Sequence, residues 1–149
     1  MSPNKETKKA VAKSTGLTAE EKAAMKETLK ERKMAANKQE MEKAALEAIA
    51  KMKEPDRSLA KRVHEIVSAA APNLLAKTWY GMPAYANAEG KVICFFQAAS
   101  KIGVRYATFG FQPDAKLDDG NIRAAGFALI KLTSAEEAKI IALVKKAVR

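Results

Sequence analysis

Aromatic side chains gather in one short stretch of the sequence, where they could stack on a flat ligand or line a pocket. The run Trp79-Tyr80-Gly81-Met82-Pro83-Ala84-Tyr85 holds the single tryptophan and two of the three tyrosines. In the other interpretation, these aromatics pack a sheet edge while Gly81 and Pro83 shape a bend in a strand. Both interpretations stay open. The candidate ligand-binding residues, which include one basic residue further along the chain, are Trp79, Tyr80, Met82, Tyr85 and Arg105.

Three aspartates stand close together before a Gly-Asn pair, and their carboxylate oxygens could hold a hard cation. These candidate metal ligands are Asp114, Asp118 and Asp119. Their spacing matches no calcium-loop pattern. The alternative is turn chemistry, because aspartate caps local amides and glycine accepts a positive φ.

The sequence has one histidine, His64, and one cysteine, Cys94. A single cysteine excludes an internal disulfide and a zinc site built from cysteines. We expect His64 to lie partly exposed beside the apolar face of a helix, and Cys94 to be buried on a strand and unreactive. Nucleophilic catalysis needs a nucleophile, a base and an orienting group, and no such set or phosphate-binding glycine loop is visible. The sequence therefore predicts a protein that is not an enzyme.

The chain is strongly basic, with 27 Lys and Arg against 17 Asp and Glu in 149 residues, a net charge of +10. The excess is spread along the chain, since residues 1–53 carry 13 basic and 8 acidic residues and the remainder 14 and 9. Such a charge attracts anionic partners. Near the N-terminus Lys22, Lys26 and Lys30 recur at helical spacing and could contact phosphates, although a solvated helix with interleaved glutamates has the same pattern.

No stretch approaches the roughly 20 apolar residues of a membrane helix. We therefore expect no membrane association and, from the single cysteine, a cytoplasmic location. We also expect a monomer, because no large amphipathic stripe is left over once the core is assigned.

Helical patterns occupy the first part of the chain. Residues 1–16 have almost nothing to bury and are predicted to be disordered. Thr18 and Glu21 have capping-box spacing and start an exposed helix to about residue 36. A second helix is predicted over residues 39–53, and a third follows Pro55, buries Leu59, Val63, Ile66, Val67 and Ala70, and ends at Pro72.

After residue 73 the pattern becomes β. Strands are predicted at about residues 77–80, 92–97, 103–109 and 127–132, with turns at 87–90 and 98–101. A second capping box, Thr133 to Glu136, starts a terminal helix whose core-facing residues are Ile140, Ile141, Val144 and Val148. The fold class is therefore α+β: an antiparallel meander of four or five strands packed against N-terminal and C-terminal helices. The predicted parts are residues 1–38, a basic tail with an exposed helix, and residues 39–149, the folded domain.

Three motifs in order resemble a known family: Lys77-Thr-Trp-Tyr-Gly-Met-Pro-Ala-Tyr85, then Val92-Ile-Cys-Phe-Phe-Gln97, then Arg105-Tyr106-Ala107-Thr108. Residues 39–149 resemble the YdhG-like domain of unknown function 1801, found mostly in bacteria. The resemblance implies an α+β fold of the YdhG/CyaY-like group. Some members are described as frataxin-like iron chaperones, so it also implies iron as a possible cargo.

Three functional hypotheses follow. The first is a non-enzymatic binding protein with an iron-chaperone-like role, which requires acidic residues to gather in space from the set Glu65, Asp114, Asp118, Asp119, Glu136 and Glu137. The alternative is an accessory protein that binds nucleic acid or another anionic partner through its basic surface and N-terminal extension. The third is a small-ligand pocket beside the aromatic run.

Overall fold

The computed structural model describes residues 18–149, so the predicted disorder of residues 1–16 lies outside the described residues. The chain divides into two compact units, residues 1–37 and residues 38–149. Within residues 18–149, the helices and strands follow one another in the order α2 Ala19–Ala50, α3 Asp56–Ala70, β1 Leu75–Trp79, β2 Met82–Ala86, β3 Val92–Gln97, α4 Ala99–Ile102, β4 Ala107–Phe111, β5 Asp118–Asp119, β6 Ile122–Arg123, β7 Gly126–Leu129 and α5 Ser134–Ala147.

The first unit, where it is described, is helical and exposed at every residue. Its predicted capping box is confirmed: the Thr18 backbone N–H donates to Glu21 at 2.9 Å, and the Glu21 N–H donates to the Thr18 hydroxyl at 3.0 Å. The predicted break near residue 37 is wrong, because α2 continues to Ala50. Residues 35–38 contain neither glycine nor proline, so nothing local stops the helix.

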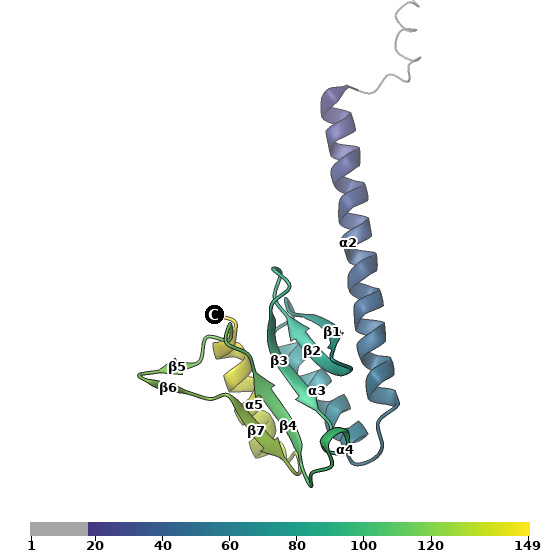
Figure 1. Ribbon diagram of the computed structural model, residues 1–149. Helices are drawn as coiled ribbons and strands as arrows, with labels where there is room; N and C mark the ends of the chain where they lie inside the picture. The colour runs from purple at the N-terminus through teal and green to yellow at the C-terminus, as the bar shows by residue number, and fades with distance from the viewer. Residues whose placement is uncertain (1–17) are drawn as a thin grey trace, which may run out of the picture. The chain divides into compact units, whose positions relative to one another are not determined.

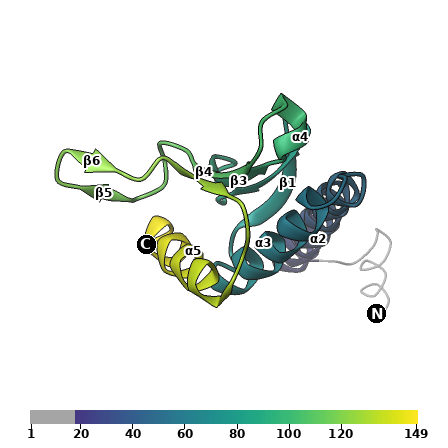
Figure 2. The same ribbon diagram turned by 90° about the horizontal axis from the view of Figure 1, so that it is seen from below.

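The second unit contains a five-stranded antiparallel sheet with strand order β1-β2-β3-β4-β7, and this confirms the predicted α+β class. Helices α3 and α5 lie on one side of the sheet, as Figure 2 shows. The last turns of α2 add Ala45 and Ile49 to the core that these layers enclose. Among residues 18–149, neither α3 nor α5 covers the opposite side of the sheet, and only the short helix α4 lies there, at its border (Figures 1 and 2).

The register of the strands determines which side chains lie between the sheet and the helices. Tyr85 pairs with Ala76 on one side and Cys94 on the other, and Cys94 pairs with Phe111. Residues paired across strands share a face. Tyr85, Cys94 and the neighbouring Phe96 and Phe109 are almost fully buried, so this row forms the sheet's contribution to the core.

His64 is buried, which corrects the expectation of a partly exposed histidine. Its Nδ1 lies 3.0 Å from the Tyr85 hydroxyl, and its Nε2 lies 3.2 Å from a carboxylate oxygen of Glu42. A buried phenol needs a hydrogen-bond partner, and His64 supplies it from α3. Burial raises the pKa of Tyr85, which keeps the phenol protonated.

Several element bounds differ from those predicted. Strand β2 was missed because Gly81 and Pro83 look like strand breakers. Tyr80 and Gly81, with φ of 52° and 77°, form the two-residue turn between β1 and β2, and Pro83 lies before the β2–β3 pairing begins at Ala84.

The remaining corrections concern the second half of the chain. The predicted turn at residues 98–101 is helix α4, the predicted strand 103–109 is β4 at Ala107–Phe111, and the predicted strand 127–132 is β7 at Gly126–Leu129. A small hairpin, β5–β6, was not predicted. Strand β3 and the capping box of α5 are as predicted. Val148 is exposed because it follows the last residue of α5.

Replacing Tyr85 with phenylalanine should destabilise the protein by about 1–3 kcal/mol, because the buried Nδ1 of His64 loses its partner. Urea unfolding of the full-length protein measures the change. The matched control is Tyr80→Phe, which removes the same atom from a residue that is 78% exposed, and it should change stability by less than about 0.5 kcal/mol. Equal effects of the two substitutions would contradict a structural role for the buried hydroxyl.

Candidate functional site

A second row of side chains crosses the whole sheet on the face away from α3 and α5. The paired residues are Lys77, Ala84, Phe95, Gly110 and Gly126, one from each of the five strands. They alternate along their strands with the Tyr85 row, which faces α3, so they must point to the other side. Figure 1 views the sheet from this side, with α3 and α5 behind it. We call this surface the helix-free face.

Three aromatic rings form a continuous ridge along one part of the helix-free face. The ring centroids of Trp79 and Phe95 are 5.4 Å apart, and those of Trp79 and Tyr80 are 5.0 Å apart. Tyr80 is 78% exposed, and Trp79 and Phe95 are half-buried. We call Trp79, Tyr80 and Phe95 the aromatic ridge. Such an arrangement leaves ring surface accessible to a flat ligand.

Beside the ridge the helix-free face is flattened by small residues. The Phe95 ring lies so close over Gly110 that a Cβ on this glycine would overlap it. Gly126 pairs with Gly110, and Ala128 pairs with Thr108 in the next row. The exposed backbone of Gly126 and Ala128 therefore forms a shelf that a ligand can approach closely.

The charged side chains that the strands contribute to the helix-free face are basic. The five strands of the sheet contain no aspartate or glutamate, and Lys77 lies in the row of Phe95. The Lys101 ammonium lies 3.5 Å from the point that a Cβ on Gly81 would occupy, so a second cation stands beside the ridge. Anions approaching the ridge consequently meet positive charge.

A buried carboxylate anchors the short helix that carries Lys101. Asp56, in the first turn of α3, accepts hydrogen bonds from the backbone N–H groups of Ala99 and Ser100, each at 3.2 Å, and from the Ser100 hydroxyl at 3.0 Å. These donors form the start of α4, the short helix that carries Lys101. Asp56 thus anchors α4 to the domain.

The predicted ligand-binding residues separate into different surroundings. Trp79 and Tyr80 belong to the ridge, and Met82 is buried opposite Trp79. Tyr85 lies in the core on the other face. Arg105 is exposed after α4, where its guanidinium lies 5.7 Å from the Tyr106 ring centroid. The five residues therefore do not line one pocket.

Sequence reasoning missed Phe95 as a site residue. It alternates with Cys94 and Phe96 on β3, and both of those are fully buried. That alternation was the available signal, since a large aromatic between two core residues must face the other side of the sheet.

The predicted metal ligands Asp114, Asp118 and Asp119 are exposed, the last two on β5 before the turn at Gly120. Within residues 18–149, no three or more His, Cys, Asp or Glu side chains are grouped so that they could hold a metal ion. Other acids of the proposed iron set are engaged. Arg62 contacts both Glu65 and Glu137 and holds the pKa of Glu137 below its usual value, and Glu136 caps α5 through Thr133.

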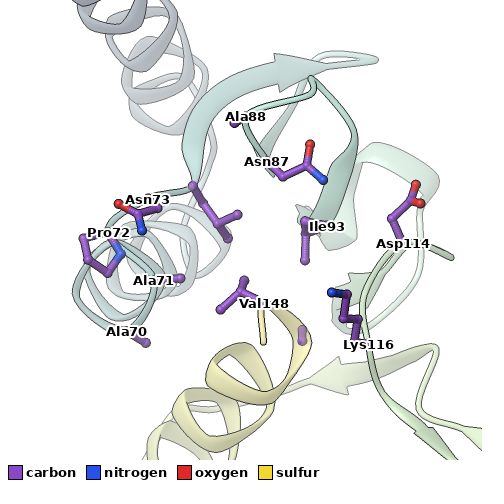
Figure 3. Close-up of a pocket in the computed structure, with 12 residues that line it drawn as sticks. Ala70, Ala71, Pro72, Asn73, Asn87, Ala88, Ile93, Asp114, Lys116 and Val148 are labelled. Carbon is purple, nitrogen blue, oxygen red and sulfur yellow. The ribbon is translucent and has the colours of Figure 1, made fainter.

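A pocket of about 410 Å³ opens at the end of the domain where α3 and α5 finish (Figure 3). Ala71, Leu74, Ile93 and Ala147 give it an apolar floor, while Asp114 and Lys116 stand at one side. The Asn87 side chain at its rim already accepts hydrogen bonds from the backbone N–H groups of Glu89 and Lys91. The pocket was missed because its residues come from five separate stretches of the chain.

No family model, curated protein or solved structure was found to match the chain. The resemblance to the YdhG-like family therefore stays a prediction. Within residues 18–149, none of the helices combines the length and apolar character that crossing a membrane requires.

Cys94 should react with iodoacetamide only after the protein unfolds, because its side chain is fully buried and burial raises the pKa of its thiol. The measurement is the alkylation rate by mass spectrometry with and without urea. The variant Ser68→Cys provides the positive control, since residue 68 is exposed on α3. Alkylation of the native protein at the rate of this added thiol would contradict the expectation.

Proposed function

We propose that this protein binds single-stranded nucleic acid on the helix-free face of its sheet and catalyses no reaction there. The observation that carries the proposal is the aromatic ridge on a sheet without carboxylates, bordered by Lys77 and Lys101. Surfaces that bind single strands combine stacking rings with positive charge.

The proposed binding mode assigns a role to each part of the face. Unpaired bases stack on Trp79, Tyr80 and Phe95, and the adjacent phosphates pair with the two lysines. The shelf of Gly126 and Ala128 gives the strand room to lie close to the protein. A duplex is disfavoured, because its bases are already stacked on one another.

An iron-chaperone-like role, which the YdhG-like resemblance implies, is supported by that resemblance alone. In the described residues the candidate carboxylates are dispersed or already paired. Nucleic-acid binding accords better with the net charge of +10. It also accords with a cytoplasmic location, which we propose on the basis of the single, buried cysteine.

Trp79 is the only tryptophan, so its fluorescence reports directly on the ridge. Titration of the full-length protein with a single-stranded oligonucleotide should quench this fluorescence, and a duplex of the same sequence should quench it less. Tyr80→Ala should weaken binding by about 1–3 kcal/mol, the usual loss for a stacked base. The residue is exposed, so the fold should not change.

Charge variants distinguish binding at the helix-free face from the general attraction of an anion to a basic protein. Lys77→Gln and Lys101→Gln should each lower affinity and reduce the slope of log K against log salt by about one. The matched control is Lys145→Gln, which removes the same charge from α5 and should have a smaller effect on both. Triple replacement of Lys22, Lys26 and Lys30 by glutamine measures how much the N-terminal extension contributes to the affinity for the oligonucleotide.

The proposal fails if the oligonucleotide does not bind, or if Tyr80→Ala leaves the affinity unchanged. It also fails if Lys145→Gln is as damaging as Lys77→Gln, since binding would then follow net charge alone.

A further inference from the structure

Strand β7 is an edge strand that lacks the features that usually prevent another strand from pairing with it. Within the part of the chain that the structure describes, it pairs only with β4, and its sequence Gly-Phe-Ala-Leu contains no charge, no proline and no bulge. The residue after it, Ile130, is 63% exposed. Exposed apolar edges of this kind accept a further strand, and proteins normally block them with charges or bulges.

The register shows which backbone groups of β7 are free. The Phe111 N–H donates to the Ala125 carbonyl at 2.9 Å, so Ala125 directs its polar groups toward β4. Polar groups alternate in direction along an antiparallel strand. Gly126 and Ala128 therefore direct their N–H and C=O groups to the open edge, and both residues are exposed.

A groove runs between this edge and α5. It encloses about 310 Å³ and is lined by Phe127 and Leu129 from the strand and by Ile140 and Leu143 from the helix. A strand added to β7 would direct alternate side chains into this groove.

One charged side chain in the groove, Lys139, has no anionic partner among the described residues. The Lys139 ammonium lies 5.1 Å from the centroid of the Phe127 ring, and within residues 18–149 it forms no salt bridge. The carboxylate of Glu136, which also lines the groove, is held by Thr133, and this contact lowers its pKa. Lys139 is thus the charge available to an incoming group.

We propose that an extended segment of a partner protein adds to β7 as a sixth strand, with apolar side chains in the groove and an acidic side chain on Lys139. This is strand addition, in which main-chain hydrogen bonds supply affinity and alternate side chains supply specificity. A second copy of the chain fits less well. Its own β7 carries no acidic residue and leads into Lys131, so it brings no carboxylate to Lys139.

The test selects peptides from a displayed random pool on the full-length protein and measures a synthetic enriched peptide by fluorescence anisotropy. The enriched peptides should alternate apolar residues and contain an acid. Ala128→Pro should lower affinity by about tenfold or more, since it removes an outward N–H while leaving the bonds to β4 intact. Lys139→Glu should switch the selection to basic peptides, and Lys145→Glu, the same change outside the groove, should not.

Urea unfolding confirms that each variant is folded before binding is compared. Peptides that bind Ala128→Pro and Lys139→Glu as well as they bind the natural sequence would overturn the proposal, as would a failure of the pool to enrich. A dimer in sedimentation that Ala128→Pro dissociates would overturn it in favour of a second copy. Lys139→Glu should leave oligonucleotide quenching of Trp79 almost unchanged, so the two sites can fail independently.

Discussion

The hydroxyl group of Tyr85 cannot be buried without a hydrogen-bond partner, and the sheet is arranged around this requirement. His64 provides the partner from α3 and contacts Glu42 of α2 through its other ring nitrogen. A slip of β2 by one residue would turn Tyr85 outward and break this chain of contacts. The same slip would bring Ala84 inward, so the buried contact and the apolar residues beside it favour the same register.

The two faces of the sheet consequently have different characters. The inner face is closed by aromatic and aliphatic residues such as Phe96 and Phe109, which are fully buried. The outer face combines rings, small residues and lysines, which is a poor composition for a core but a good one for a wet interface. Asp56 contributes at the border between them, because a buried carboxylate on α3 positions a surface helix.

Sequence patterns predicted what depends on local structure. Both capping boxes and strand β3 could be recognised because periodicity and side-chain capping are local properties. The continuity of α2 and the presence of β2 could not be, since helix stops and strand breakers were judged without knowledge of the neighbouring elements. The aromatic run was recognised as distinctive, but its division between two faces depends on strand register. The pocket of Figure 3 arises from residues far apart in the chain, and no short motif reports it. The groove beside β7 is formed by consecutive elements, but it depends on how α5 packs against that strand, which local patterns do not show.

The contact between Phe95 and Gly110 has a consequence for the proposed binding of bases on the aromatic ridge. The ring packs directly on the backbone of Gly110, and this packing limits the orientations open to it, so that less rotational entropy is left to lose on binding. A preorganised ring binds flat partners whose rings can stack on it, while flexible apolar chains gain less binding free energy from it. In the proposed binding mode, the missing side chain at Gly110 therefore selects for flat ligands, although Gly110 itself touches none of them.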